Sequence, residues 1–210
     1  MNNYLLKYGS SNLLYVFILV ILGIVLKNKY IIILAILCLI FLFYFFRAPV
    51  SSKKYLPQDT IVVAPSFGKV TNIIENYDSI LVSTFLSVFD PHVQYIPINS
   101  HLNKIKYFPG KFNAANFFKK TRYNERCSYY FKSKFGNLVV TQIAGMIARK
   151  IVSFVKPNNN YSQGTELGMI KFGSRVDILI EKNKDYNFFT TCKVGDYLYG
   201  NDSQIGYFST

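Results

Sequence analysis

The feature that most constrains the fold is an abrupt change in the hydrophobic pattern near Arg47. Before it lie two long apolar runs, residues 13–26 and 30–46, separated by Lys27-Asn28-Lys29. A helix that is apolar all round has no face for water and is buried in protein or lipid. The 17 residues of the second run would form a helix roughly 25 Å long, slightly short of the ~30 Å hydrocarbon core of a bilayer. Residues 1–46 are therefore predicted to form a membrane-inserted helical hairpin that either spans the bilayer or dips into one leaflet.

The basic residues around these runs predict an orientation. Lys7 precedes the two apolar runs, and Arg47, Lys53 and Lys54 follow them, against two lysines in the turn. Positive charge beside apolar segments favours the cytoplasmic side of a membrane. The main domain is therefore expected on the cytoplasmic face of the cell membrane.

After a polar linker at 47–60, the apolar runs become short and are separated by Gly, Pro, Asn and Asp. Such a pattern is typical of strands and turns, and it predicts a mainly β domain at 61–210, a compact β-barrel or sandwich. Gly164 and Gly195 are predicted to lie in turns. The segments around these turns resemble the hairpins of lipoyl- and biotin-carrier domains in strand shape, without their modified lysine. The predicted strands are 61–64, 68–74, 80–86, 93–98, 128–132, 138–143, 150–155 and 169–180.

The charge of the chain indicates an anionic partner. All 11 acidic residues follow Arg47, and residues 47–210 carry 21 basic groups, a net charge of +10. A basic surface suits a phospholipid membrane or nucleic acid. The apolar N-terminus favours the membrane, which leaves a membrane-tethered module that binds nucleic acid as an alternative.

The cysteines and histidines are too few and too scattered for other kinds of site. Cys38, Cys127 and Cys192 are widely spaced, and the chain has only two histidines. This pattern supports neither a disulfide framework nor a metal site, and it fits a reducing compartment.

The most informative stretch for function is residues 168–180, G-M-I-K-F-G-S-R-V-D-I-L-I. Glycine inside a predicted strand marks a bulge or a close approach of backbone. At Gly173-Ser174 it also places a hydroxyl beside an unshielded carbonyl. That geometry suits an N→O acyl shift, in which the Ser174 oxygen attacks the Gly173 carbonyl and the resulting ester eliminates to leave an N-terminal pyruvoyl group. By itself the dipeptide is more typical of an ordinary bulged strand.

Other motifs strengthen the first interpretation. They are F-F-R-A-P at 45–49, D-P-H-V at 90–93, N-E-R at 124–126 and Q-I-A-G-M-I-A-R at 142–149. Together with the Gly173-Ser174 stretch, they resemble the short form of phosphatidylserine decarboxylase, in the order of that family, from about residue 45 to the C-terminus.

The resemblance implies a proenzyme that cuts itself between Gly173 and Ser174. The products would be a β chain of residues 1–173 and an α chain of 37 residues, held together as a heterodimer by strand pairing. Whether two such pairs associate is left open. The cofactor would be the pyruvoyl group made from Ser174, whose ketone forms a Schiff base with the amine of phosphatidylserine. Loss of CO2 would give phosphatidylethanolamine, and the hairpin would keep the domain beside its membrane-bound substrate.

The resemblance also assigns roles to other residues. His92 would take the Ser174 proton in self-cleavage and later transfer a proton at the substrate α-carbon, with Asp90 or Tyr95 as support. The other histidine, His101, is expected in a polar surface turn. Four basic residues near the motifs are expected to bind the lipid phosphate or carboxylate: Arg126, Arg149, Lys171 and Arg175.

One departure from the family pattern bears on all of this. The segment A-P-S-F-G-K-V at 64–70 stands where the family has S-P-A-D-G-K-V, so Phe67 replaces the acid that orients the catalytic histidine. Loss of such an acid slows catalysis by orders of magnitude and leaves the geometry usable. Slow self-cleavage is compatible with this change. The alternative is a pseudoenzyme of the same fold that binds anionic phospholipid without maturing.

Overall fold

The computed structural model describes residues 4–49, 59–111, 123–145, 150–171 and 174–209. The chain divides into two compact units, Met1–Pro49 and Val50–Thr210. Part of the predicted linker, residues 50–58, lies outside the described residues, as do Gly173 and Arg149.

The first unit is helical. Asn28 begins α3 by accepting a hydrogen bond from Tyr30 N at 3.0 Å, a typical N-cap. Gly23 lets the two long helices approach closely, because a Cβ there would lie 2.7 Å from Ile32 Cγ1. The helices are α1 (Tyr4–Tyr8), α2 (Ser10–Val25) and α3 (Lys29–Phe45).

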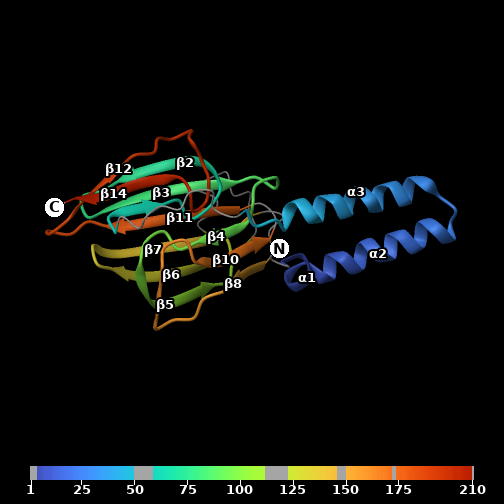
Figure 1. The fold of residues 1–210 in the computed structure, drawn as a ribbon, viewed down its shortest axis with the longest axis horizontal. Helices are drawn as coiled ribbons and strands as arrows, with labels where there is room; N and C mark the ends of the chain where they lie inside the picture. The colour runs from blue at the N-terminus through green and yellow to red at the C-terminus, as the bar shows by residue number, and fades with distance from the viewer. Residues whose placement is uncertain (1–3, 50–58, 112–122, 146–149, 172–173, 210) are drawn as a thin grey trace. The chain divides into compact units, whose positions relative to one another are not determined.

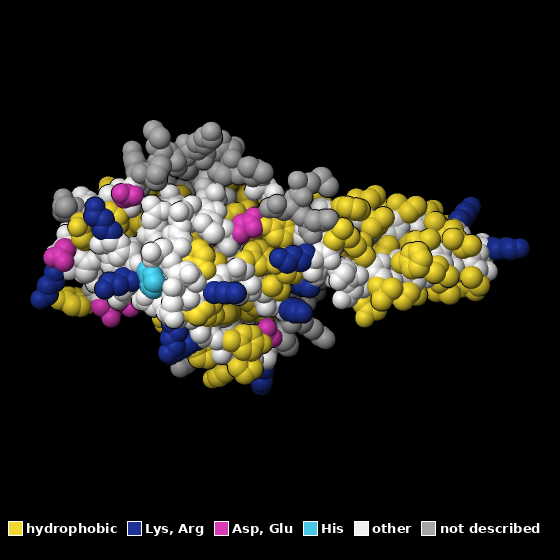
Figure 2. Space-filling model, turned by 60° about the horizontal axis from the view of Figure 1, so that its bottom comes forward, with side chains coloured by type: hydrophobic (Ala, Val, Ile, Leu, Met, Phe, Trp, Pro, Cys, Tyr) yellow, Lys and Arg dark blue, Asp and Glu magenta, His cyan; other side chains and the backbone are white. Residues whose placement is uncertain are grey.

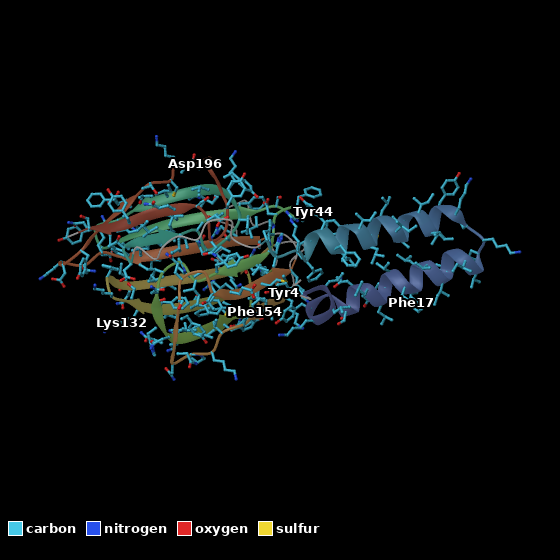
Figure 3. The ribbon with its side chains drawn as sticks, viewed as in Figure 1. Tyr4, Phe17, Tyr44, Lys132, Phe154 and Asp196 are labelled. Carbon is cyan, nitrogen blue, oxygen red and sulfur yellow. The ribbon has the colours of Figure 1, made fainter. Side chains whose placement is uncertain are left out.

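Both long helices expose apolar side chains. Phe17 points away from α2 and is 61% exposed (Figure 3). Hydrophobic side chains dominate the visible surface of these helices, whereas basic side chains are scattered over the visible face of the β unit (Figure 2). Among the helices that the structure describes, none is both long and apolar enough to cross a membrane.

The described residues of the second unit form three antiparallel sheets (Figure 1). The largest has eight strands in the order β13-β2-β3-β11-β7-β6-β5-β9, and the two smaller ones have the orders β4-β10-β8 and β1-β14-β12. The strands are β1 (Ile61–Val63), β2 (Gly68–Glu75), β3 (Ser79–Leu86), β4 (Val93–Tyr95), β5 (Ser100–Phe108), β6 (Arg126–Ser133), β7 (Gly136–Ala144), β8 (Lys150–Ser153), β9 (Asn159–Tyr161), β10 (Glu166–Lys171), β11 (Ser174–Glu181), β12 (Asn187–Thr190), β13 (Tyr197–Leu198) and β14 (Gln204–Ser209).

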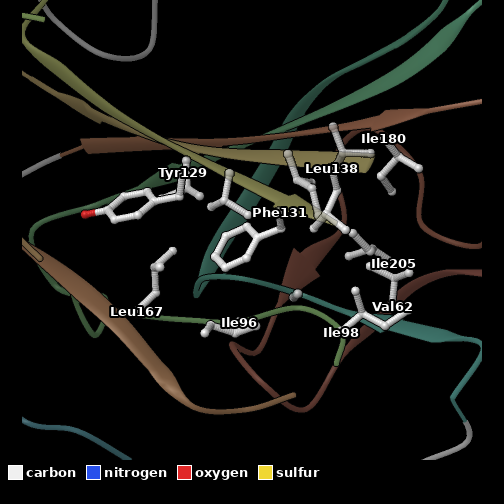
Figure 4. Close-up of a cluster of buried hydrophobic side chains, with 14 of the residues drawn as sticks. Val62, Ile96, Ile98, Tyr129, Phe131, Leu138, Leu167, Ile180 and Ile205 are labelled. Carbon is white, nitrogen blue, oxygen red and sulfur yellow. The ribbon is translucent and has the colours of Figure 1, made fainter. Parts of the chain in front are cut away.

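The predicted mainly β fold is confirmed, but within the described residues no sheet closes into a barrel. The large sheet ends at β13 on one side and β9 on the other. Buried side chains of β6, β7 and β11 pack against residues of the smaller sheets and of the segment after β4, including Val62, Ile96, Leu167 and Ile205 (Figure 4). Periodicity shows that strands have a buried face, and it does not show whether a sheet closes or is covered by another.

Local predictions differ in outcome. Gly164 and Gly195 have positive φ angles of 80° and 101°, as turns require. His101, expected in a turn, lies in β5, where its Nδ1 is 2.7 Å from Asn160 Oδ1. The pairing of β5 with β6 shifts register between Leu102 and Lys104. This bulge interrupts the alternation by which a strand is recognised.

Candidate active site

Ser174 is the first residue of β11, in the middle of the large sheet. It pairs with Leu86 of β3 on one side and Ala144 of β7 on the other. Its side chain is fully buried, and its Oγ has no hydrogen-bond partner among the described residues. This oxygen is therefore shielded from water and makes no hydrogen bond to a described residue, which is costly for a buried hydroxyl.

The chain changes sheets at the predicted cleavage position. β10 ends at Lys171 in the sheet with β4 and β8, and β11 begins at Ser174 in the large sheet. The single strand predicted for 169–180 is therefore wrong. Apolar residues lie on both sides of the Gly173-Ser174 pair, and their pattern does not reveal that one strand ends there and another begins.

His92 lies directly before β4 and is fully buried. Its Nδ1 is 2.6 Å from the backbone oxygen of Asp90. Because a carbonyl only accepts hydrogen bonds, Nδ1 is the protonated nitrogen, and in the neutral ring Nε2 carries the lone pair. The backbone oxygen of His92 accepts a hydrogen bond from Ile170 N at 3.2 Å, which ties His92 to β10 just before the cleavage position. His92 is thus held with a basic nitrogen, as a proton acceptor requires.

Asp90 contacts His92 through its backbone. Its carboxylate accepts hydrogen bonds from Ser87 N at 2.8 Å and from Tyr197 Oη at 2.5 Å. We expected the Asp90 carboxylate to support the His92 ring, but the Asp90 backbone carbonyl does so instead. A backbone oxygen fixes the imidazole tautomer, as a carboxylate would, but it supplies no full negative charge.

Tyr95 and Phe67 pack together. Their ring centroids are 6.4 Å apart in a T-shaped arrangement, and Phe67 makes a similar contact with Tyr199. Burial raises the pKa of Tyr95 above its usual range, and Glu166 and Asp202 raise it further, so its hydroxyl stays protonated. The family's acid position is thus occupied by a buried aromatic cluster, in which a carboxylate would be poorly solvated.

The N-E-R segment anchors the strand beside Ser174. Asn124 Nδ2 donates to the backbone oxygen of Ala144 at 2.8 Å, and Ala144 N donates to Glu125 O at 2.9 Å. Gly110 allows this segment to approach, since a Cβ there would lie 2.4 Å from Tyr123 O. Sequence reasoning noted the motif without finding this role, for which the only local signal was an asparagine just before a strand.

The three predicted basic residues that the structure describes lie in two different sheets. Arg175 alternates with Ser174 along β11, so it lies on the opposite face of the sheet, where it forms a buried ion pair with Asp177 at 2.9 Å. Burial raises the pKa of Asp177, and Arg175 acts against this shift. Arg126 shares this face through its pairing with Ile143, and its guanidinium lies 4.7 Å from the centroid of the Phe108 ring.

Lys171 belongs to the small sheet, at the end of β10. It pairs with Lys150 in the small sheet, and burial together with the Lys150 charge lowers its pKa.

Within the described parts of the chain, no group of three or more His, Cys, Asp or Glu side chains has the arrangement of a metal site.

A buried serine without a hydrogen-bond partner among the described residues thus lies at a crossover between two sheets, and the strand before it binds the backbone of a buried histidine. A model of the phosphatidylserine decarboxylase family matches residues 38–205. The phosphatidylserine decarboxylase proenzyme of Syntrophus aciditrophicus is 32% identical over 98% of this chain and 94% of its own length. That of Carboxydothermus hydrogenoformans is 34% identical over 90% and 89%. The chain belongs to the phosphatidylserine decarboxylase family.

Proposed function

We propose that this protein is a phosphatidylserine decarboxylase that matures by cutting itself between Gly173 and Ser174. The observation that carries the proposal is the fully buried Ser174 Oγ, which has no partner among the described residues. Such an oxygen fits the precursor of a pyruvoyl group, because a hydroxyl engaged in structure would have to break its hydrogen bonds before reacting. The alternatives of an uncut lipid-binding protein or a nucleic-acid module are not favoured, since the relatives are named as proenzymes.

In the proposed cleavage, Ser174 Oγ attacks the Gly173 carbonyl carbon while His92 Nε2 accepts the hydroxyl proton. The carbon–nitrogen bond then breaks, and the proton passes to the departing Ser174 nitrogen, which leaves an ester. Removal of the Ser174 α-proton expels the Gly173 carboxylate. The remaining enamine tautomerises, and water releases ammonia to give the pyruvoyl group. The protein contributes the proton acceptor and the exclusion of competing water from the ester.

In the mature enzyme, the pyruvoyl carbonyl would supply an electron sink for the loss of CO2 from an amino acid headgroup. His92 would hold the proton to be delivered at the α-carbon. β11 pairs with β3 and β7 over most of its length, so this strand would stay in the middle of the large sheet after the cut and would hold the chain of residues 174–210 in place. We propose that the two chains remain associated for this reason.

We also propose that residues 1–46 hold the enzyme at the cell membrane, with the β unit on the cytoplasmic face. The exposed apolar side chains of α2 and α3 and the basic β unit support this placement. The substrate is confined to the bilayer, so an enzyme held there meets it at high local concentration.

The test is to purify the full-length protein and measure intact masses under denaturing conditions. Two chains divided after Gly173, with a borohydride-reducible carbonyl on the smaller, would support the proposal. The same preparation should release CO2 from phosphatidylserine in mixed micelles, and Ser174→Ala should do neither. A wild-type chain that remains uncut would contradict the proposal.

A further inference from the structure

A chain of buried polar side chains runs through the interior to His92. Tyr129 Oη donates to Gln142 Oε1 at 2.7 Å, Gln142 Nε2 donates to Gln94 Oε1 at 2.6 Å, and Gln94 Nε2 donates to the backbone oxygen of His92 at 2.8 Å. All four residues are fully buried. These four side chains therefore make no hydrogen bonds with bulk water.

The direction of these hydrogen bonds is fixed from the His92 end. The His92 carbonyl only accepts, so Gln94 has to present its NH2 group to it and its oxygen to Gln142. The same reasoning orients Gln142, whose oxygen then needs a donor, and the Tyr129 hydroxyl supplies it. Burial raises the pKa of Tyr129 above its usual range, so the hydroxyl keeps its proton. Each side chain thus has a single orientation that satisfies its neighbours.

The side chains of Tyr129, Gln142 and Gln94 form a polar bridge between the large sheet, which contains Ser174, and the segment that contains His92. Gln142 on β7 pairs with Val176 of β11, which is two residues after Ser174. Because residues two apart in a strand share a face, Gln142 lies on the same face of the sheet as Ser174. Gln94 belongs to β4 in the small sheet. Gly168 of β10 leaves room for this bridge, because a Cβ there would lie 2.9 Å from Gln142 Nε2.

Two buried amides and a phenol are a costly way to fill a core. Apolar side chains of similar size would avoid the desolvation of these groups and would pack as well. The bridge ends on the backbone of the one buried histidine, and that histidine makes its ring hydrogen bond only two residues earlier, to Asp90. Its geometry is suited to holding His92 at a set distance from the large sheet.

We propose that Gln94, Gln142 and Tyr129 are positioning residues that hold His92 in place for self-cleavage. This inference rests on the proposed function. In the family pattern, an acid at position 67 orients the histidine. We assign part of this role to the polar bridge between the two sheets. The bridge touches no reacting atom and acts through the His92 backbone.

The test uses Gln94→Glu and Gln94→Met in the full-length chain, synthesised without cells in the presence of lipid vesicles. The fraction of cut chain is followed over time from pH 5 to pH 9. A protonated glutamic acid donates to His92 and accepts from Gln142, whereas the carboxylate loses the donor and repels the carbonyl. Burial raises the pKa of this carboxyl. We expect Gln94→Glu to cut about 10²-fold more slowly than wild type at pH 9 and to recover towards pH 5.

Gln94→Met cannot titrate, and we expect it to remain slow at every pH. Other titratable groups on or beside the surrounding strands include His92 itself, Tyr95 on β4, Cys127 and Tyr129 on β6, Lys150 on β8, Glu166 and Lys171 on β10, and Asp177 on β11. All are present in both variants, so the ratio of the two rates at each pH isolates the new carboxyl. A role confined to packing would slow both variants without making this ratio depend on pH.

Gln163→Glu is the matched control. Gln163 Nε2 also donates to backbone oxygens, those of Ile61 at 2.8 Å and Pro97 at 2.9 Å, but it has no bond to His92 or to the bridge. We expect this variant to keep the wild-type pH profile of cleavage.

The outcomes separate the two proposals. A wild-type chain that never cuts contradicts the proposed function, whereas a wild-type chain that cuts, with folded Gln94 variants cutting equally fast, overturns the positioning role alone. Folding is checked by resistance to limited proteolysis. If both Gln94 variants fail this check, Tyr129→Phe decides, because it removes only one oxygen. It should cut severalfold more slowly than wild type, and a wild-type rate in folded Tyr129→Phe would also overturn the inference.

Discussion

Ser174 and His92 are both fully buried, but their surroundings differ in how polar atoms are satisfied. Ser174 lies in a regular part of the large sheet, and its hydroxyl has no partner among the described residues. His92 lies before a three-residue strand. Its ring donates a hydrogen bond to the Asp90 carbonyl, and its backbone oxygen accepts hydrogen bonds from Gln94 and Ile170. The Ser174 hydroxyl, which is proposed to be consumed, makes no described hydrogen bond. His92, which is proposed to act repeatedly, is held by several.

This difference has a physical basis. A nucleophile without hydrogen bonds attacks without first breaking them, and its desolvation cost is part of what the reaction relieves. A base has to keep one tautomer and one position through many turnovers, which fixed partners provide. The variants below test this contrast, beginning with the largest expected effect.

Ser174→Ala should abolish cleavage completely, because no oxygen remains to attack Gly173. It should not destabilise the fold, since the hydroxyl makes no described hydrogen bond, and removing an unpaired buried group is neutral or stabilising. Intact mass and thermal unfolding measure the two effects. A marked fall in unfolding temperature would show that Ser174 has a structural partner, and the contrast with His92 would fail.

His92→Ala should slow cleavage by about 10²–10⁴-fold, the usual contribution of a positioned proton acceptor. Unlike Ser174→Ala, it should also lower the free energy of unfolding by about 1–3 kcal/mol, because the Asp90 carbonyl loses its donor. Both variants consist of a single uncut chain, so their denaturant unfolding curves are directly comparable. Equal stabilities would argue against an anchoring role for the hydrogen bonds of His92.

Arg175→Met should leave the chemistry intact and affect stability, because Arg175 lies on the other face of β11. Removing one partner of a buried ion pair typically costs about 3–5 kcal/mol. In the folded state, the pKa of Asp177 is raised by burial above its unfolded value of 3.8. The cost of the unpaired Asp177 carboxylate is therefore fully present above the folded-state pKa of Asp177. It is relieved as pH falls through that pKa and the carboxyl becomes neutral, so part of the stability lost in Arg175→Met should return at low pH.

This comparison is best made in the uncut Ser174→Ala background by urea unfolding at several pH values. The double variant Arg175→Met, Asp177→Leu serves as the control, since it leaves no buried charge and should lack the acid recovery. A deficit independent of pH would contradict the role assigned to Asp177.

Asn124→Ala should have the smallest effect. It removes the bond to the Ala144 carbonyl, and one lost hydrogen bond of this kind costs about 1 kcal/mol. Because Ala144 pairs with Ser174, cleavage should also slow, by less than in His92→Ala. Time courses of cleavage by intact mass measure this, with Asn137→Ala as a control whose exposed side chain bonds Glu181.

The mainly β unit was predicted from the sequence and is confirmed. Gly173, Ser174 and His92 were selected as candidates because glycine, serine and histidine have distinct local properties, and their roles stay predictions. Prediction from the sequence was wrong about a single strand at 169–180 and about His101, where pairing partners and a bulge override the local pattern. It placed Arg175 among the substrate-binding residues, without knowing which face of β11 points to the core. The polar bridge went unnoticed, since its three residues come from separate strands.

By itself, the sequence determined that a Gly-Ser pair lies in an apolar, β-forming stretch, that only two histidines are available, and that Phe67 replaces the family's acid. Only the tertiary structure decided that β10 and β11 join different sheets, that His92 is oriented by a carbonyl, and that Arg175 is engaged with Asp177. Periodicity is a local property of the chain. The pairings of β10 with β4 and of β11 with β3 and β7 join segments far apart in sequence, and hydrogen-bond partners follow from those pairings.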